Sequence, residues 1–369
     1  MNSPITFGVM REILPRERRV ALTPDGAERL IAAGHAVVME SGAGSAAGFD
    51  DDEYRAMGAT IALSNREVGQ AIDVLVKVHG PGPAEYELLP QGATVAGFLH
   101  LSNPNADALR TVIRDKKMSA IAFELLEDDD GARPVLEAVS AIGGRVAVML
   151  AAQSLLSSGG GAGRLLGGAP GVPPLNVVII GAGAAGEAAA REAQRMGARV
   201  SVLDRDSKAL TRVARRIEGI LTAVASRRHL DRAVATADLL ICAVATAGRP
   251  APKIVSRRQV RSMPTDAMII DMSVDEGGCC ETTRPHTNEE SYEEEGVRHL
   301  CVPNLPSEVA QTASIAFTNA ILPFLLAIGD KSPDPALSSE PPLHRGTVYI
   351  SGSLHNAVVA ELTGEPLGE

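Results

Sequence analysis

Cysteine is scarce in this chain of 369 residues, which has only Cys242, Cys279, Cys280 and Cys301. They form no CxxC motif, and no histidine stands at metal-ligand spacing from them, so no metal site is predicted. A disulfide framework is not expected in so large a chain, and we expect reduced thiols in a cytoplasmic protein. The adjacent Cys279 and Cys280 could form a redox switch, but small packing residues beside two glycines are the preferred interpretation.

Basic charge and targeting signals are also lacking. The net charge of −10 argues against a nucleic-acid partner and fits a protein that acts on small molecules. The first residues, MNSPITFGVMREI, lack the basic and apolar regions of a signal peptide. Only one run, VAQTASIAFTNAILPFLLAI at 309–328, is long enough to resemble a membrane span. Its polar residues and Pro323 favour a buried helix, and no membrane partner is predicted.

The length predicts two domains, and the pattern suggests how they are connected. Short apolar runs alternate with helical patterns up to about residue 130, and again from NVVIIGAGAAG onward, which predicts parallel, helix-covered α/β sheets. Long apolar helices near 133–157 and 307–328 bracket the second block. We therefore predict that one domain, residues 136–306, is inserted into a second domain made of residues 1–135 and 307–369. The cleft between such domains is the usual place for a ligand.

The motif with the most weight is G-x-G-x-x-G at Gly181, Gly183 and Gly186, in NVVIIGAGAAGEAAAREAQRMGARVSVLDRD. An apolar strand precedes it, an Ala-rich helix follows, and a second strand ends in Asp204, which is the full context of a dinucleotide site. The three glycines would permit a tight turn, the approach of the pyrophosphate and close helix packing. Asp204 would bind the adenine ribose and favour NAD over NADP, although the adjacent Arg205 weakens that preference. The alternative is a glycine-rich turn that binds nothing.

Three candidate residues for substrate chemistry lie on separate segments of the first block. Arg19 stands in RERRVALTP, Lys77 in the apolar run VLVKV, and His100 after the apolar run AGFL. An amino-acid dehydrogenase needs a cation for the carboxylate, a group that polarises the oxo oxygen, and an acid/base. Each residue also has an ordinary interpretation: a surface arginine, a lysine whose ammonium reaches solvent, and a histidine satisfied at a strand end.

Several longer blocks resemble the family of alanine dehydrogenases and nicotinamide nucleotide transhydrogenase alpha subunits. They include REILPRERRVALTPDGAERLIAAGHAVVMESGAG, the loop GGGAGRLLGGAPGV, AVATAGRPAPKIVS, IIDMSVDEGGC and VPNLPSEVAQTASIAFTNA. The match runs almost from end to end and is closest to the alanine dehydrogenases. The resemblance implies two Rossmann-like domains, NAD as cofactor and a homo-oligomer, commonly a hexamer.

The resemblance also implies roles for individual residues. Arg19 would bind the substrate carboxylate, Lys77 would hold and polarise the oxo or imine group, and His100 would be the general acid/base. Asp275 matches the catalytic carboxylate, and Asn304 matches a residue that lines the cleft. The predicted cofactor contacts, besides the three glycines and Asp204, are Ala184, Ala185, Ser140, Val244 and Ala245.

Some positions depart from the family pattern. His79-Gly80 replaces a charged pair after Lys77, while Val139 and Leu305 replace residues expected near the substrate methyl group. We predict NAD-dependent deamination of a small L-α-amino acid to the 2-oxo acid and ammonia, alanine or a close analogue, and the reverse reaction. The alternatives are a larger, saccharopine-type or biosynthetic substrate, and the NAD(H)-binding subunit of a proton-translocating transhydrogenase.

Overall fold

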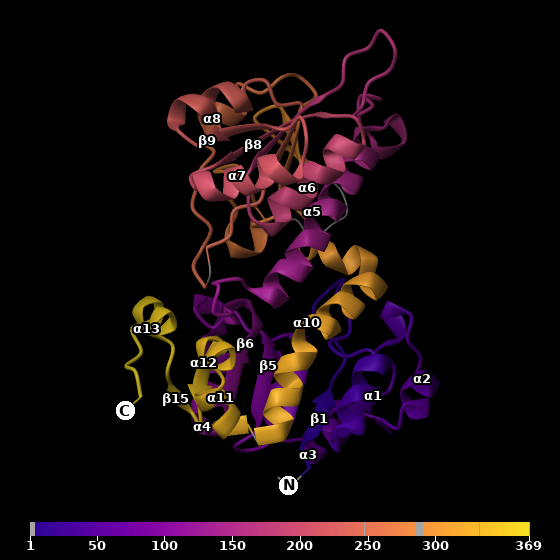
Figure 1. The fold of residues 1–369 in the computed structure, drawn as a ribbon, viewed down its shortest axis with the longest axis vertical. Helices are drawn as coiled ribbons and strands as arrows, with labels where there is room; N and C mark the ends of the chain where they lie inside the picture. The colour runs from indigo at the N-terminus through magenta and orange to yellow at the C-terminus, as the bar shows by residue number, and fades with distance from the viewer. Residues whose placement is uncertain (1–3, 247, 285–290, 332, 369) are drawn as a thin grey trace. The chain divides into compact units, whose positions relative to one another are not determined.

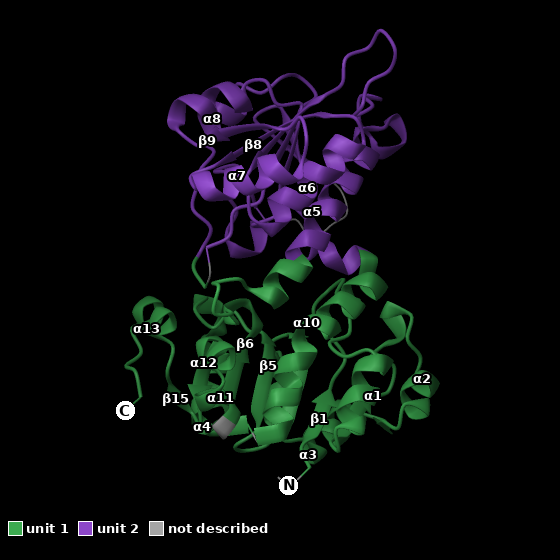
Figure 2. Ribbon diagram, viewed as in Figure 1, with its two compact units in different colours: residues 1–139, 247–249, 309–369 green, residues 140–246, 250–308 purple. Residues whose placement is uncertain are grey.

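The computed structural model describes residues 4–246, 248–284, 291–331 and 333–368. The chain divides into two compact units, shown in different colours in Figure 2. Unit 1 contains residues 1–139, 247–249 and 309–369, and unit 2 contains residues 140–246 and 250–308. Unit 2 is therefore inserted in the sequence of unit 1. It begins at residue 140 and ends at residue 308, whereas the limits predicted from the sequence are residues 136 and 306.

Unit 1 contains an eight-stranded sheet in the order β15-β14-β6-β5-β4-β1-β2-β3. The strands from β1 to β6 are parallel, while β14 and β15 extend the β6 edge in antiparallel fashion. The strands are β1 (Thr6–Val9), β2 (Ala36–Glu40), β3 (Thr60–Ala62), β4 (Val74–His79), β5 (Thr94–Phe98), β6 (Ser119–Ala122), β14 (Thr347–Ile350) and β15 (Ser353–Leu354).

The helices of unit 1 lie on segments that connect or follow these strands (Figure 1). They are α1 (Pro24–Ala32), α2 (Asp51–Ala56), α3 (Asn65–Ala71), α4 (Asp107–Asp115), α10 (Ala310–Lys331), α11 (Pro333–Ser339), α12 (Pro341–Gly346) and α13 (Ala357–Thr363). Helix α1 begins at Pro24, where the missing N–H costs nothing, and ends just before Gly34, whose φ is 93°. The Pro-rich stretch that follows α10 forms two short helices, each with proline in its first turn.

Unit 2 contains a seven-stranded sheet in the order β12-β13-β11-β10-β7-β8-β9, in which only the β12–β13 pair is antiparallel. Its strands are β7 (Asn176–Ile180), β8 (Arg199–Asp204), β9 (Leu221–Val224), β10 (Leu239–Cys242), β11 (Met268–Asp271), β12 (Tyr292–Glu294) and β13 (Val297–His299). Its helices are most of α5 (Pro134–Leu155), and α6 (Ala184–Arg195), α7 (Ser207–Arg216), α8 (Arg227–Val234) and α9 (Arg257–Val260).

Both sheets have the doubly wound order of a Rossmann fold. In each, the second and third strands extend outward from the first strand, and the fourth pairs with the other side of the first. The predicted fold class, α/β with two Rossmann-like parallel sheets, is confirmed. In such sheets, ligands bind at the carboxyl ends of the strands where the order reverses. That point lies between β1 and β4 in unit 1 and between β7 and β10 in unit 2.

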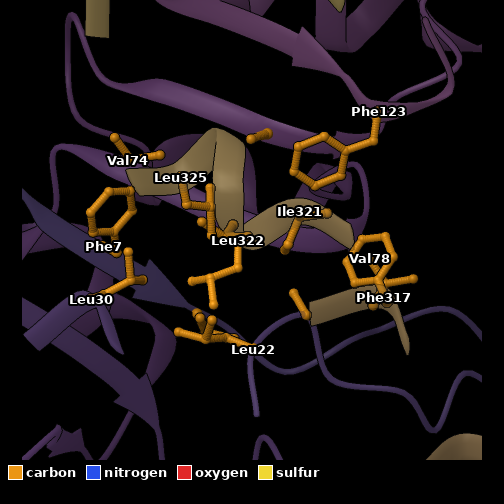
Figure 3. Packing of buried hydrophobic residues seen from close by; sticks show 14 of the residues in the cluster. Phe7, Leu22, Leu30, Val74, Val78, Phe123, Phe317, Ile321, Leu322 and Leu325 are labelled. Atoms are coloured by element: carbon orange, nitrogen blue, oxygen red, sulfur yellow. The ribbon is translucent and has the colours of Figure 1, made fainter. Parts of the chain in front are cut away.

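Helix α10 is the central helix of the unit 1 core. Its residues Phe317, Ile321, Leu322 and Leu325 are at most 1% exposed and pack in one cluster with side chains from β1 and β4. Figure 3 shows these α10 side chains among Phe7, Leu22, Leu30, Val74, Val78 and Phe123. The apolar run is therefore buried by the sheet, and the helix continues through Pro323.

A second helix, α5, is also long and apolar enough to cross a membrane, so the expectation of a single such stretch was wrong. Val146, Ala147, Val148 and Ala151 of α5 are buried. Length and apolar composition alone cannot reveal this burial, because a core helix and a membrane-spanning helix can have the same length and composition.

Candidate active site

The glycine motif forms the turn between β7 and α6. Gly181 has φ of 108°, and a Cβ atom there would collide with the carbonyl oxygen of Ala243, which follows the neighbouring strand β10. A Cβ atom at Gly186 would collide with the carbonyl oxygen of Gly181. A Cβ atom at Gly183 would meet nothing within 4 Å. Two glycines are thus required by the protein's own packing, whereas Gly183 borders open space that a ligand can use.

Helix α6 starts directly behind this open space. Gly183 is its N-cap residue, and no side chain caps the helix. Ala184 and Ala185 are half-buried in the first turn. The first N–H groups of a helix have no partner within it and carry partial positive charge, so this end suits a pyrophosphate.

Asp204 ends β8 beside the glycine turn. One carboxylate oxygen accepts a hydrogen bond from the N–H of Ala182 at 2.6 Å, and the other accepts one from the N–H of Asp206 at 2.8 Å. The side chain is half-buried. Since a carboxylate can accept about four hydrogen bonds, this fixed group has capacity for ribose hydroxyls.

The other predicted cofactor contacts surround the same turn. A Cβ atom on Gly181 would lie 3.2 Å from the Cγ2 of Val244, which places Val244 beside the motif. Ala245 follows it and is exposed. Ser140 is half-buried on α5, one turn before Gly144, whose missing side chain lets α5 pack against the backbone of Ala185.

Asp275 and Asn304 lie next to each other in unit 2. Asp275 is exposed in a short 3-10 helix, Val274–Glu276, and its Oδ2 is 3.4 Å from the backbone nitrogen of Asn304. Asn304 has φ of 57°, a left-handed conformation that asparagine tolerates. The 3-10 helix that contains Asp275 and the loop that contains Asn304 therefore lie side by side.

A buried carboxylate that the sequence reasoning missed shapes this loop. Asp271 ends β11 and is 1% exposed. Its oxygens accept hydrogen bonds from the N–H groups of Ser273 (3.0 Å), Cys279 (2.6 Å) and Cys280 (3.1 Å). Asp271 therefore ties both ends of the loop that carries Asp275. The D-x-x-x-D spacing directly after a buried strand was the available signal.

The four cysteines are all buried in unit 2. The Sγ atoms of Cys242 and Cys280 are 3.5 Å apart, and the donor atoms of Cys242, Cys280 and Asp271 lie within 4.8 Å of one another. The hydrogen bond with Cys280 and burial raise the pKa of the Cys242 thiol, and burial raises the pKa of Cys279 to about 12. Raised pKa values make the Cys242 and Cys279 thiols poor nucleophiles, which suits buried packing residues.

In unit 1, Lys77 lies on β4 with its side chain completely buried. The ammonium donates hydrogen bonds to Glu85 Oε1 at 2.8 Å and to the carbonyl oxygen of Arg11 at 2.9 Å. Glu85 is 1% exposed and lies in a 3-10 helix, Pro83–Leu88. The ordinary interpretation, an ammonium that reaches solvent, is wrong. Lys77 instead forms a buried ion pair with Glu85, which the apolar strand pattern did not reveal.

Arg19 is 3% exposed and is held by a neighbouring carboxylate. Its Nε and Nη2 atoms donate to the two oxygens of Glu17, at 2.8 and 2.6 Å. Burial raises the pKa of Glu17, but hydrogen bonds from Arg19 and His79 outweigh it and bring that pKa far below its usual range. Arg19 is thus a buried, oriented guanidinium and not a surface charge.

A third carboxylate, Glu12, completes the charged cluster of unit 1. It accepts hydrogen bonds from the N–H groups of Val78 (2.7 Å) and His79 (3.4 Å) at the end of β4. Burial raises the pKa of Glu12, against the opposing charges of Lys77 and His79. Carboxylates therefore hold the strand end as well as both cations.

His100 follows β5, the strand next to β4, and adopts a left-handed conformation with φ of 45°. The buried Glu124 accepts a hydrogen bond from its backbone N–H at 2.7 Å and so stabilises this conformation. The imidazole is half-buried and stacks on Phe98, with ring centroids 6.3 Å apart. A non-glycine residue held at positive φ by a buried carboxylate is typical of functional sites.

The structure thus brings the predicted residues together in two sets. In unit 1, Lys77 and His100 lie near the carboxyl ends of β4 and β5, and Arg19 contacts His79 at the end of β4. The predicted cofactor residues lie in unit 2 with Asp275 and Asn304, and Ser140 is the first residue of that unit. That the two sets meet around one bound substrate is a prediction. Val139 and Leu305 are both buried, at 9% and 5% exposure, and their place beside a substrate is likewise a prediction.

Comparison with known proteins gives the same family over both units. The model of the alanine dehydrogenase/PNT N-terminal domain matches residues 8–143, and that of the C-terminal domain matches residues 147–357. An alanine dehydrogenase of Halomonas elongata is 38% identical over 360 residues, 97% of this chain and 96% of the relative.

Two solved structures show the same similarity. An L-alanine dehydrogenase has a TM-score of 0.91 at 35% identity and covers 98% of this chain and 99% of its own. A transhydrogenase from Sinorhizobium meliloti has a TM-score of 0.80 at 26% identity, with 95% and 99% covered. Both comparisons extend over nearly the whole chain, and the first is the stronger.

Proposed function

The chain belongs to the alanine dehydrogenase/PNT family, and from this premise we propose that it is an NAD-dependent amino-acid dehydrogenase. It would oxidise a small L-α-amino acid, alanine or a close analogue, to the 2-oxo acid and ammonia, and catalyse the reverse reductive amination. The observation that carries this proposal is the pair of buried cations, Arg19 and Lys77, at the carboxyl edge of the unit 1 sheet. A substrate with a carboxylate and an oxo group needs both, whereas NAD(H) binding by itself needs neither.

Residues of unit 2 fit NAD. Gly183 borders open space, the first turn of α6 offers N–H groups without a side-chain cap, and Asp204 is fixed beside them. When bound, NAD would accept the α-hydride of the amino acid. A 2′-phosphate would face the Asp204 carboxylate, so NAD is expected to bind better than NADP.

Side chains of unit 1 would manage the substrate. The guanidinium of Arg19 would hold the carboxylate, since a planar cation suits that group. Loss of hydride converts the amino acid into an imine, and attack by water then forms a tetrahedral carbinolamine. His100 and Asp275 would move the protons of that water and of the departing ammonia. Lys77 would stabilise the oxygen as the carbonyl forms, because the Glu85 ion pair keeps the ammonium in place.

The functional test is an assay of L-amino acids with NAD at alkaline pH, followed by the absorbance of NADH. We expect alanine or a close analogue to be oxidised, with D-alanine inactive and NADP poorer than NAD. Activity confined to saccharopine or another large amino acid would instead favour the biosynthetic alternative. Binding of NADH without oxidation of any amino acid would favour the transhydrogenase component.

We propose a cytoplasmic homo-oligomer, by analogy with the family.

The glycine motif supplies a matched pair of variants. Gly183→Ala should leave the free energy of unfolding within about 1 kcal/mol of wild type, because a Cβ atom meets nothing there, and should weaken NADH binding about tenfold or more. Gly186→Ala should destabilise the protein by about 1–3 kcal/mol through the collision with Gly181. Urea unfolding and the fluorescence of NADH on titration measure the two effects. Wild-type NADH affinity in Gly183→Ala would show that no pyrophosphate lies there.

A further inference from the structure

His79 contacts the Arg19–Glu17 pair but has no assigned role in the reaction. Its Nε2 atom lies 2.9 Å from Glu17 Oε2 and 3.1 Å from Arg19 Nη2. The side chain comes from the last residue of β4 and is 13% exposed. The imidazole therefore reaches from the sheet into the buried pair formed by the segment after β1.

The chemistry of the three groups decides what Nε2 does. A guanidinium nitrogen can only donate and an ionised carboxylate can only accept, so a single ring nitrogen satisfies one of them at a time. Glu17 is the nearer group, and its pKa far below the usual range keeps it ionised. We infer that Nε2 carries the ring proton and donates a hydrogen bond to Glu17.

With this bond, the Glu17 carboxylate accepts four hydrogen bonds. Oε1 accepts from the backbone nitrogen of Arg19 at 2.9 Å and from its Nε at 2.8 Å. Oε2 accepts from Arg19 Nη2 at 2.6 Å and from His79 at 2.9 Å. Three of these four donors belong to Arg19. The fourth, His79, is the donor that comes from a strand of the sheet.

The backbone of His79 is itself well anchored. His79 pairs with Phe98 of the neighbouring strand β5, and its backbone nitrogen lies 3.4 Å from Glu12 Oε2. A ring mounted on this strand end can hold Glu17 against rotation, and through Glu17 it can hold the plane of the guanidinium.

We propose that His79 is a positioning residue that acts through Glu17 to orient Arg19 toward the carboxylate of the substrate. This inference rests on the proposed function, in which Arg19 binds that carboxylate. Misorientation of a binding group weakens substrate binding more than the chemical step, which is carried by other side chains. The effect should therefore appear in KM.

The test compares His79→Leu with His79→Gln, because the glutamine amide nitrogen can reach the position of Nε2 and donate to Glu17. We expect His79→Leu to raise KM for the amino acid about 10- to 100-fold, as for loss of a hydrogen bond to a charged group, with kcat changed less than about threefold. His79→Gln should recover most of the loss. His355→Leu, which changes an exposed histidine of unit 1, is the control and should match wild type.

Calorimetric binding of pyruvate to the protein with NADH gives a second readout, and urea unfolding checks that each variant is folded. If wild type oxidises amino acids but His79→Leu keeps its KM and pyruvate affinity, the positioning role is wrong and the proposed function stands. The role is equally wrong if His79→Gln is as impaired as His79→Leu. If wild type neither oxidises amino acids nor binds pyruvate, the proposed function fails, and the role fails with it.

Discussion

Lys77→Ala is expected to lower kcat by about two to three orders of magnitude while NADH binding stays close to wild type. The ammonium would stabilise the oxygen that forms at the reacting carbon, and removal of one such donor costs about two to three orders of magnitude in comparable sites. The same change leaves Glu85 buried and unpaired, which should lower the free energy of unfolding by about 3–5 kcal/mol. Steady-state kinetics, NADH titration and urea unfolding measure the three quantities.

Two controls separate the catalytic loss from the loss of stability. The double variant Lys77→Met/Glu85→Gln removes both charges, so it should recover much of the stability but none of the turnover. Lys116→Ala is the matched lysine variant, since Lys116 donates to the carbonyl oxygens of Tyr86 and Leu89 next to the same 3-10 helix. It should cost about 1 kcal/mol and leave kcat unchanged. Full turnover in Lys77→Ala would remove Lys77 from the mechanism.

Asp275→Asn is expected to lower kcat by about two to four orders of magnitude with little change in stability or NADH binding. The carboxylate would handle protons next to the substrate, and a general acid/base contributes about that much. The side chain is exposed, and an asparagine oxygen can still accept the hydrogen bond from the Asn304 N–H, so the fold loses little. Kinetics and thermal unfolding of the same preparation provide the measurement.

Asp266→Asn is the matched control for this variant. Asp266 is exposed, has φ of 61°, and precedes the same strand, β11, that Asp275 follows. Asparagine tolerates this conformation, so activity and stability should both equal those of wild type. If Asp275→Asn retains more than half of the wild-type kcat, the proton transfers must be assigned to other groups.

The cofactor turn shows how much a local pattern can predict. Its three glycines lie within six residues. Nearby backbone leaves no room for a Cβ atom at Gly181 and Gly186, whereas Gly183 borders open space. The contact that requires Gly186 is local, with Gly181, whereas the contact that requires Gly181 is with Ala243 after the neighbouring strand. The glycine spacing together with the apolar strand before it and the Ala-rich helix after it was therefore sufficient to predict the turn and its relation to α6.

The substrate residues show the opposite case. Lys77 was singled out by its apolar neighbours, but its partner Glu85 lies eight residues later, in a segment with no distinctive pattern. The D-x-x-x-D spacing marks Asp271, but it does not show that this carboxylate accepts backbone N–H groups from Cys279 and Cys280, eight and nine residues later. Hydrogen-bond partners of buried charges are chosen by three-dimensional proximity, which the alternation of strands and helices does not specify.

The sequence by itself predicted two parallel, helix-covered sheets and the glycine turn, because these follow from hydrophobic periodicity and short-range sterics. The tertiary structure decided the order of the strands, which carboxylate neutralises each buried cation, and which groups contact Glu17 and the backbone of His100. Burying a charge costs several kcal/mol unless a partner is adjacent. That partner can come from any segment the fold brings near, so only the folded chain reveals it.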